Sequence, residues 1–439
     1  MNGLKKILIV VCCILLLAVG WLAAIFSKTD ADRQKELMAA AQAYLDDEIY
    51  VKAVPLLEEA AGYDAKYTLQ AEEKLKEAYV PLLDQSGYSR KYTNLLARQM
   101  ERKDAGPEVY LEAAQYYLER SKNEKAFDAL KAGIKKTGSQ ELIDCYEANR
   151  YAYHVGRGAY QEVTDFLNGR IQVKQDGYWG LALPSGNLDL PCEYDFLSTY
   201  YDGEVIAQKD GVLTGIDADG NRLALYKGEP VSGVTNYNEG RLAVRQSGGW
   251  VLDTDELQTG SAVLEDIGTF SNGGAAAKLN GKWGVVGRNG KDWLVEPNYD
   301  GILCDDLGRC WCDKAVFVRQ GDQVLLLVDG KQVGDTYEDA RPFAGGWAAV
   351  KKNGLWGYID LEGTVQIDFQ FDNARSFTMH LAAVQNGDNW GYVGLDGDMV
   401  IDPIFLEAKA FSDGTAPVKT ADGWQFITLL EYKTGNFGF

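Results

Sequence analysis

Gly354-Leu-Trp-Gly-Tyr-Ile-Asp360 opens a unit that the second half of the chain copies several times. The unit continues through a glycine turn into Thr364-Val-Gln-Ile-Asp-Phe369, then Phe371-Asp-Asn-Ala-Arg-Ser-Phe377, and ends on Leu381-Ala-Ala-Val384. Apolar and polar residues alternate over short runs between these turns, which is typical of antiparallel strands. The stretch therefore predicts a β unit of several short strands.

The tryptophan position of this unit recurs at a nearly constant spacing. The mean interval is about 35 residues, and the copies are centred near Trp179, Leu213, Trp250, Trp283, Leu325, Trp356, Trp390 and Trp424. A fixed period in this range indicates one supersecondary unit repeated along the chain. The copies near Leu213, Trp250 and Leu325 depart most from the pattern, so we expect irregular strands there.

Tight turns are predicted just before the tryptophan strands. The pairs that mark them are Asp176-Gly177, Asp210-Gly211, Asn280-Gly281, Asn353-Gly354 and Asp422-Gly423. Asn, Asp and Gly tolerate the positive φ angles that a two-residue hairpin requires. We therefore expect the tryptophan strand to be the second arm of a hairpin.

These features resemble the WG-repeat family of bacterial proteins, whose unit reads roughly Lys-Trp-Gly-Tyr-Ile-Asp, a turn, Tyr-Asp-x-Ala-x-x-Phe and an Ala-Ala-Val strand. The resemblance extends from Tyr160 to at least Trp424. It implies a repeat architecture, and no catalytic residues come with the motif.

The two ends of the repeat region are complementary. It opens on a Tyr-Asp-like element at Tyr160 and finishes on a tryptophan strand, so the strand 424–429 can pair beside the first strands, 160–174. Ring closure would remove exposed sheet edges. We predict a C-terminal all-β domain over 160–439, a propeller of seven or eight blades; an open β-solenoid of the same units is the alternative.

Tryptophan side chains have two interpretations here, as core residues or as platforms for sugars. Six recur in phase with the repeat and are predicted to be structural, each giving its unit a large apolar contact with the next: Trp179, Trp250, Trp283, Trp356, Trp390 and Trp424. The glycine beside each should leave space for a neighbouring ring or backbone. Trp311, in an insertion that stretches one interval to 42 residues, is the candidate for an exposed ligand contact.

Helical periodicity, rich in Ala, Leu, Glu and Lys, occupies residues 28–159. Small and large apolar residues at 37–60 and 107–140 resemble those of tetratricopeptide units, where small residues let two helices approach closely. Residues 68–102 match this pattern poorly, although they read as helical. The resemblance implies a short solenoid whose concave face holds an extended peptide; a helical stalk is the alternative.

The N-terminal segment 1–27 is predicted to be a cytoplasmic stub and a transmembrane helix. Residues 7–26 are uncharged and apolar, which is long enough to span a bilayer, and Lys5 and Lys6 precede them. Lysines before the span favour a single-pass protein with the bulk of the chain outside the cytoplasm. A cleaved signal peptide is the alternative.

The net charge of −20 argues against nucleic-acid binding, because it repels phosphate. It also makes a strongly anionic envelope polymer a poor ligand. Neutral or amino sugars remain compatible with it.

Cysteine is sparse, and Cys304, Cys310 and Cys312 share one loop. A disulfide from Cys304 to either of the others would suit an exported domain, and unpaired thiols are the alternative. The spacing does not fit a zinc site, and neither histidine is near.

No nucleophile elbow, HExxH or phosphate-binding loop occurs in the sequence. Asp217-Ala-Asp219-Gly-Asn221 begins like a calcium loop, but Arg222 stands where the turn glycine belongs, so we interpret it as a β-turn. We expect no cofactor, no metal and no enzymatic activity.

Three functions are compatible with these patterns. The favoured one is a non-catalytic, membrane-anchored scaffold of the bacterial envelope that binds a protein partner through its repeat surfaces. The second is a binder of neutral envelope glycans. The third is a glycoside hydrolase with paired carboxylates across the ring.

Overall fold

The computed structural model describes residues 29–156, 158–225, 231–254 and 259–431. The chain divides into two compact units, 1–148 and 149–439. The expected transmembrane helix, within 1–27, lies outside the described residues. Within those residues, no helix combines the length and the apolar character needed to cross a membrane.

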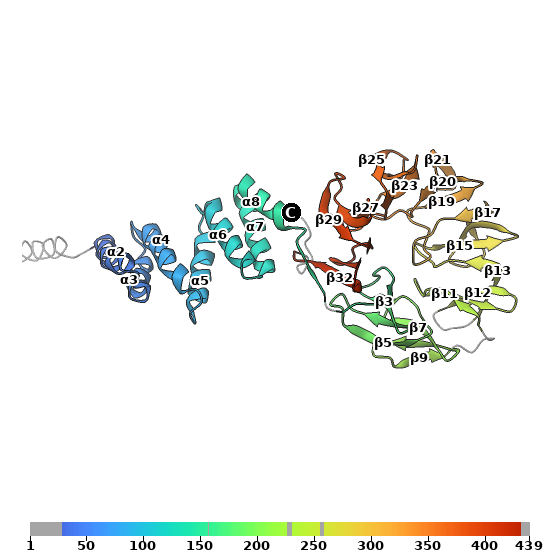
Figure 1. Ribbon diagram of the computed structural model, residues 1–439, viewed down its shortest axis with the longest axis horizontal. Helices are drawn as coiled ribbons and strands as arrows, with labels where there is room; N and C mark the ends of the chain where they lie inside the picture. Colours follow the sequence, from blue (N-terminus) through green and yellow to red (C-terminus); the bar gives the residue numbers. More distant parts are fainter. Residues whose placement is uncertain (1–28, 157, 226–230, 255–258, 432–439) are drawn as a thin grey trace, which may run out of the picture. The chain divides into compact units, whose positions relative to one another are not determined.

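The first unit consists of helices joined by short turns (Figure 1). Its elements are α2 (Asp30–Asp46), α3 (Tyr50–Gly62), α4 (Thr68–Tyr79), the 3₁₀ turn η1 (Val80–Leu82), α5 (Tyr88–Met100), α6 (Pro107–Leu118), α7 (Asn123–Thr137) and α8 (Gln140–Asn149). The expected helical character of 68–102 is confirmed in α4 and α5. Thr29 caps α2 through a reciprocal hydrogen-bond pair with Asp32.

Small residues set the distance between paired helices. A Cβ atom on Gly133 of α7 would come within 2.7 Å of the Tyr110 side chain of α6. Ala53, Ala113 and Ala126 are fully buried, as the tetratricopeptide-like pattern requires, whereas Ala40 is exposed. Close helix contact at the small positions is thus present, and the assignment to tetratricopeptide repeats stays a prediction.

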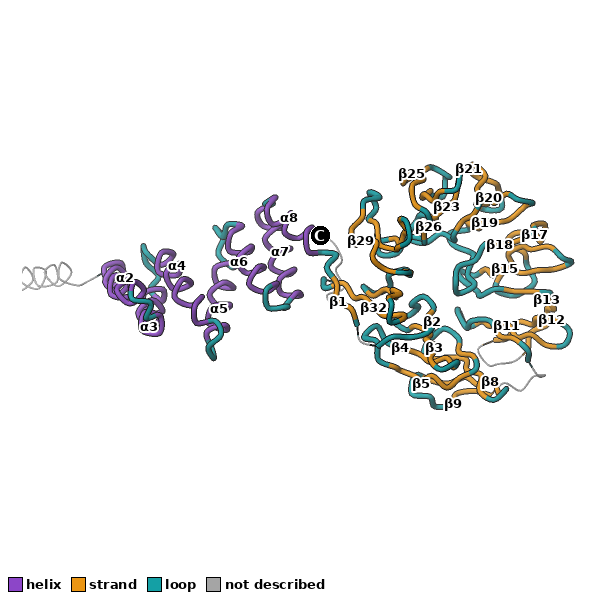
Figure 2. Tube along the Cα trace, viewed as in Figure 1, coloured by secondary structure: helices purple, strands orange, loops and turns teal. Residues whose placement is uncertain are grey.

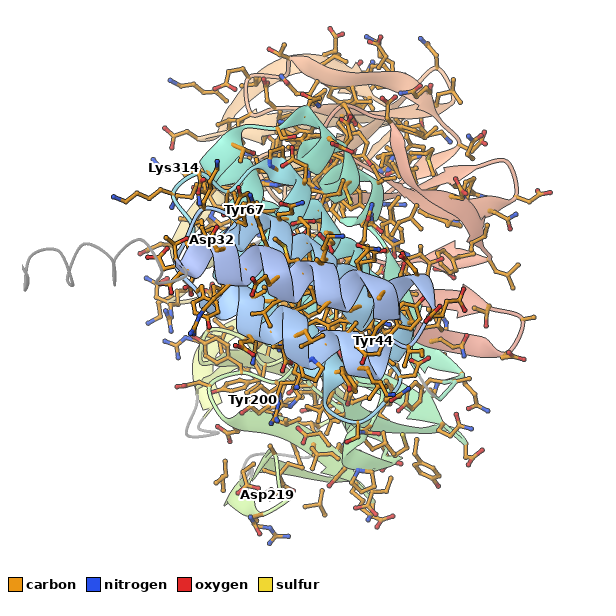
Figure 3. The ribbon with its side chains drawn as sticks, turned by 90° about the vertical axis from the view of Figure 1, so that its left-hand side faces the viewer. Asp32, Tyr44, Tyr67, Tyr200, Asp219 and Lys314 are labelled. Atoms are coloured by element: carbon orange, nitrogen blue, oxygen red, sulfur yellow. The ribbon has the colours of Figure 1, made fainter. Side chains whose placement is uncertain are left out.

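Lysines lie over tyrosine rings on the surface of this unit. The Lys35 ammonium is 4.9 Å from the centre of the Tyr67 ring, and that of Lys52 is 5.7 Å from Tyr44. Figure 3 labels both tyrosines, Tyr44 on α2 and Tyr67 in the turn before α4. Such contacts are weak at exposed sites, because water solvates the cation there.

The second unit is a ring of eight four-stranded antiparallel sheets, with the fourth strands, such as β9, β17 and β25, toward its rim (Figures 1 and 2). Blades 1 to 4 are β2 (Glu162–Val163), β3 (Ile171–Gln175), β4 (Tyr178–Ala182), β5 (Leu188–Tyr194); β6 (Phe196–Leu197), β7 (Glu204–Lys209), β8 (Val212–Asp217), β9 (Arg222–Leu225); β10 (Gly233–Val234), β11 (Arg241–Gln246), β12 (Gly249–Thr254), β13 (Thr259–Leu264); and β14 (Asp266–Ile267), β15 (Gly274–Leu279), β16 (Lys282–Gly287), β17 (Trp293–Tyr299).

Blades 5 to 8 are β18 (Gly301–Ile302), β19 (Ala315–Gln320), β20 (Gln323–Val328), β21 (Lys331–Tyr337); β22 (Asp339–Ala340), β23 (Ala348–Lys352), β24 (Leu355–Ile359), β25 (Val365–Phe371); β26 (Asn373–Ala374), β27 (Ala382–Asn386), β28 (Asn389–Val393), β29 (Met399–Phe405); and β30 (Glu407–Ala408), β31 (Thr415–Thr420), β32 (Gly423–Leu429), β1 (Tyr153–Val155). The prediction of a propeller is confirmed, with eight blades. The copies near Leu213, Trp250 and Leu325 each form a four-stranded sheet, and the pairing of the third with the fourth strand shifts register in all three.

The ring closes through the two ends of the unit. β1 is the fourth strand of blade 8 and pairs antiparallel with β32, so that Val155 lies opposite Ile427. Tyr160 also forms a bridge with Trp424. The strand that closes the ring therefore lies upstream of the expected segment, 160–174. Because β1 belongs to the ring, the boundary between the two units falls between residues 148 and 149 rather than between 159 and 160.

The second strand of each blade is buried on both faces because a neighbouring blade covers each side. Ala348, Ala349 and Val350 of β23 are all fully buried, and β15 shows the same run of small residues. Blades converge toward the axis of a ring, so the space for side chains narrows inward. This geometry explains the Ala-Ala-Val strand of the repeat.

Ring contacts between blades 6, 7 and 8 join tyrosines to phenylalanines, and Trp347 of blade 6 also packs edge-on against Phe377 of blade 7. Tyr358 of blade 6 packs on Phe377 of blade 7, with ring centres 4.6 Å apart, and its hydroxyl donates to the Arg375 carbonyl at 2.9 Å. Tyr392 repeats both contacts toward blade 8, on Phe411 and the Lys409 carbonyl.

The six in-phase indoles lie in apolar clusters that are shared by neighbouring blades. Trp356, Trp390 and Trp424 are buried, and Trp179, Trp250 and Trp283 are half-buried against the same kind of cluster. The Trp356 cluster, for example, includes Phe377 and Val384 of blade 7. The expected apolar contact with the next unit is thus supported, although between described residues none of these six indoles forms a ring-to-ring contact with another aromatic side chain.

The glycine after the tryptophan is required by the backbone of the fourth strand. Pairing between β24 and β25 shifts register between Trp356 and Tyr358, which marks a bulge. A Cβ atom on Gly357 would lie 2.8 Å from the Ile367 carbonyl oxygen. The sequence predicted that this glycine leaves space either for a neighbouring ring or for neighbouring backbone. The structure shows that it leaves space for backbone.

The predicted hairpins are present. Both residues of the Asp176, Asp210, Asn280 and Asn353 turns have positive φ, whereas at 422–423 only Gly423 does. The acidic residue that follows the fourth strand of blades 5 and 6 holds the turn of the next blade: Glu338 accepts from Gly354 N at 3.1 Å, and Asp372 from Gly387 N at 2.7 Å. This contact accounts for the acidic residue of the Tyr-Asp element.

We expect Gly357→Ala to destabilise the ring by about 1–3 kcal/mol, because the added methyl group meets backbone that cannot move aside. Urea unfolding followed by tryptophan fluorescence measures this, since nine of the ten tryptophans lie at or after residue 179.

Gly248→Ala is the matched control, because a Cβ atom there would meet nothing within 4 Å. Equal unfolding free energies for the two variants would contradict the bulge contact as the reason for the glycine.

Candidate functional site

The insertion in the fifth copy forms an extra turn on the inner side of blade 5. Asp305 accepts hydrogen bonds from the backbone nitrogens of Leu307 and Arg309 at 3.0 and 2.9 Å. The turns that begin at Asp217 and Asp360 have the same bonds, and they join third to fourth strands. We call this insertion the centre loop (residues 303–312). It contains the same kind of turn, but the turn lies between the first and second strands of its blade.

One side of the centre loop is bound to blades 3 and 4. The Leu307 carbonyl accepts from Asn236 Nδ2 at 3.2 Å and from Thr269 Oγ1 at 2.6 Å. Thr269 N also donates to the Gly308 carbonyl. Asn236 Oδ1 in turn accepts from Gln172 of blade 1 at 3.1 Å, so this anchor is part of a wider network.

The other side is bound to blades 7 and 8 by an ion-pair cluster. Asp306 contacts Arg375 at 2.9 Å and Lys409 at 2.5 Å, and Arg375 also contacts Glu407 at 3.2 Å. Burial would raise the pKa of the Asp306 carboxyl, but the two cations outweigh it and hold that pKa well below its usual range. The centre loop thus connects blades on different sides of the ring.

The pKa of the Asp305 carboxyl is shifted in the opposite direction. Burial raises that pKa, although Arg309, at 2.8 Å, opposes the rise. Two neighbouring acids therefore have pKa values displaced in opposite directions, a pattern also found in hydrolases. Here all the contacts of Asp305 lie within its own loop, and Asp306 binds the two cations, so both acids serve to hold the loop.

A cavity of about 250 Å³ lies beside the centre loop. Its lining combines three acids, three arginines and two aromatic residues with smaller polar side chains, among them Asp165, Asp305, Asp306, Arg309, Arg341, Arg375, Trp311, Phe343 and Thr378. Asp165 and Arg341 follow the first strands of blades 1 and 6.

Trp311 is buried, with only 8% of its surface exposed. It packs against Cys310, Val285 and Ala276, so the expectation of an exposed side chain was wrong. Because Trp311 also lines the cavity, its role as a ligand contact stays a prediction.

The described cysteines all carry free thiols, including Cys304, Cys310 and Cys312. A hydrogen bond with the Cys304 side chain, together with burial, raises the pKa of the Cys310 thiol well above its usual value. The Cys304 and Cys310 thiols are therefore neighbours within the centre loop. The hydrogen-bond partner of the Cys310 thiol is Cys304, not Cys312.

Two other sequence candidates are placed by the structure. The segment from Asp217 is a turn, as predicted, and Asp219 points outward at the edge of the ring (Figure 3). Within the described residues, no cluster of three or more His, Cys, Asp or Glu side chains is arranged to hold a metal ion.

Sequence reasoning missed the polar residues at the ring centre. They occupy two adjacent positions of the repeat. Arg341, Arg375 and Lys409 directly follow the first strand of blades 6, 7 and 8, whereas Asp165, Asn236 and Thr269 lie one residue further along in blades 1, 3 and 4. The signal was a pair of positions that varies in charge while the residues on either side of the pair stay apolar. Aligning the copies at these two positions would have shown it.

The sequence model described as the WG containing repeat matches residues 159–179, 261–283, 336–356, 356–390 and 390–424. The C-terminal region therefore carries WG repeats. A search of curated proteins found no match.

Several solved structures are similar to this chain. AztD from Citrobacter koseri has 11% identity and a TM-score of 0.37, over 56% of this chain and 86% of that one. The WD40 domain of SCAP from fission yeast has 9% identity and a TM-score of 0.35, over 64% and 98%. Hsv2 from Kluyvelomyces marxianus has 10% identity and a TM-score of 0.35, over 60% and 89%.

We expect Asp306→Asn to destabilise the ring by about 1 kcal/mol at neutral pH, a modest value because solvent screens a partly exposed ion pair. The Asp306 side chain is 44% exposed. Its folded pKa is lowered, so its contribution is present above the unfolded value of about 3.9 and is lost as the pH falls through the folded value. Urea unfolding should show a constant difference between the two proteins from pH 7 down to about pH 4, and the two proteins should begin to converge only in more acidic solution.

Asp329→Asn provides the control, since that carboxylate is 73% exposed and only 3.6 Å from Lys314. An effect of Asp306→Asn that is no larger than the control would contradict the role of Asp306 in holding the centre loop.

Proposed function

We propose that this protein is a non-catalytic interaction protein of the bacterial envelope, anchored through the apolar segment 7–26 and carrying both units outside the cytoplasm. The observation that supports a non-catalytic role is the engagement of the perturbed acids at the ring centre. Asp305 accepts bonds from its own loop, and Asp306 binds Arg375 and Lys409. In these roles neither acid is available as a general acid or a nucleophile.

A groove in the helical unit is suited to a protein partner. Residues of α4 and α6, together with the segment between α5 and α6, line a space of about 440 Å³. Leu69, 56% exposed, lies at its edge, and Val109 is half-buried. An exposed apolar side chain beside a groove is suited to contact with an apolar residue of a bound segment.

Charges in this groove favour a basic partner. The Lys76 ammonium lies 3.0 Å from Glu73 and 2.6 Å from Glu112, and Arg102 lies 2.9 Å from the buried Glu72. Burial would lower the pKa of Lys76, but the two glutamates outweigh it and raise that pKa.

Both cations of the groove are thus neutralised from within the unit. Asp104 and Glu108 also line the groove, and their charges leave it acidic. We infer that the partner contributes an extended, basic segment with an apolar side chain.

Glycan binding remains the second candidate, and the burial of the indoles does not favour it. Four of the nine described tryptophans are buried and the other five are half-buried, so none offers a fully open face for stacking on a sugar. Unchanged tryptophan fluorescence on titration with cell-wall fragments would remove this candidate.

A photocrosslinking amino acid placed at Leu69 of the full-length protein should capture a reproducible protein partner in intact membranes. Val51 of α3 is the matched control position, because it is 53% exposed and does not line the groove. Mass spectrometry of the crosslinked products identifies the partner and the attached segment.

Charge reversal tests the chemistry of the same contact. Glu108→Lys combined with Asp104→Lys should reduce crosslinking at Leu69 by roughly tenfold, because each reversal replaces an attraction by a repulsion. Equal capture at Leu69 and Val51, or capture insensitive to the reversals, would refute the proposed groove.

A further inference from the structure

The cavity beside the centre loop contains charges that are not used to hold that loop. Asp305 pairs with Arg309 at 2.8 Å, and Asp306 pairs with Arg375 at 2.9 Å. Of the three acids and three arginines in the lining, Asp165 and Arg341 belong to neither of these two pairs, although the Asp165 carboxylate also attracts Arg375. These two residues come from blades 1 and 6, and no ion pair within 4.0 Å joins them.

Asp165 carries an oxygen without a partner. Its Oδ1 atom is buried and accepts no hydrogen bond from any described residue. A buried carboxylate oxygen without a donor costs about 1–3 kcal/mol or more, so such atoms in folded proteins call for an explanation. A ligand that donates a hydrogen bond would satisfy it.

Arg341 is held in place but only weakly paired. Its guanidinium lies over the Trp356 ring, 4.8 Å from the ring centre, and its nearest carboxylate is Asp339 at 3.9 Å. Stacking orients the plane of an arginine while leaving its N–H groups free to bind an anion. The same position in blades 7 and 8 holds Arg375 and Lys409, which Asp306 neutralises.

A third residue in the lining has a polar atom without a partner. Thr378 Oγ1 is buried and makes no hydrogen bond to the described residues. Phe343 and Trp311 add apolar surface to the lining. The lining therefore combines a carboxylate with an unpartnered oxygen, a weakly paired arginine, a hydroxyl and an apolar wall.

We propose that this cavity binds a small zwitterion of amino-acid size, with its ammonium group on Asp165 and its carboxylate on Arg341. A ligand with a single charge would engage only one of the two residues, whereas a zwitterion engages both. The volume of about 250 Å³ is below the usual range of about 300–1,000 Å³ for drug-sized ligands, which favours a molecule this small.

This inference does not depend on the proposed protein partner, because the groove and the cavity belong to different units. Loss of one binding activity leaves the other testable in the same full-length protein.

Isothermal titration calorimetry of the full-length protein tests the ligand class. L-alanine, L-leucine and β-alanine are the zwitterionic probes, and ethylamine and propionate each carry one of the two charges of L-alanine. At least one zwitterion should bind with Kd below about 10 mM, and the single-charge compounds should bind roughly tenfold more weakly or not at all.

Variants assign the binding to the cavity. Asp165→Asn and Arg341→Gln should each weaken binding of the zwitterion roughly tenfold or more. Arg319→Gln is the matched control for Arg341, because Arg319 also lies 3.9 Å from Asp339 but does not line the cavity. Asp329→Asn is the control for Asp165, and both controls should leave affinity unchanged.

Three results would overturn the proposal: no binding of any zwitterion, equal binding of ethylamine or propionate, or affinity unaffected by Asp165→Asn. Thermal unfolding followed by tryptophan fluorescence confirms that each variant is folded. Should Arg341→Gln fail to fold because its stacking on Trp356 is lost, Asp165→Asn and the single-charge probes decide the question.

Discussion

Blades 6, 7 and 8 meet through aromatic pairs and hydrogen bonds from buried tyrosines. Tyr358 and Tyr392 each pack on a phenylalanine of the next blade and donate to a backbone carbonyl there. A buried phenol without an acceptor would be costly, so the bond fixes the register of one blade against the next. The accepting carbonyls belong to Arg375 and Lys409. The contact that joins these three blades therefore also positions the two cations that bind Asp306.

Eight copies of one unit bring equivalent pairs of positions to the centre of the ring. Apolar residues on either side of each pair are fixed by packing between blades, whereas the pair itself carries Asp, Thr, Asn, Arg or Lys in different blades. The centre loop breaks the symmetry further, since only blade 5 carries it. In a repeat fold of this kind, the residues that differ between copies provide the specific chemistry, because the residues that all copies share form the core.

The repeat period, the hairpin turns and the closure of the ring could be predicted because each depends on local rules. Paired Asn-Gly and Asp-Gly residues adopt positive φ in almost any hairpin, and complementary ends predict a closing strand. The roles of residues that depend on neighbours in space were harder to predict from the sequence. The glycine after the tryptophan is required because a Cβ atom there would meet the Ile367 carbonyl oxygen. The indoles pack against aliphatic and phenyl side chains of two blades rather than against each other.

The sequence by itself determined that the chain joins a helical segment to a β array of WG-like units, because periodicity and turn type depend on residues that are close together in the chain. Only the tertiary structure decided which strand closes the ring, that Trp311 is buried, and that Asp165 and Arg341 share a cavity. Those two residues are far apart along the chain. Their charges meet in one place because eight similar blades converge on a common axis, a constraint that no single copy of the repeat contains.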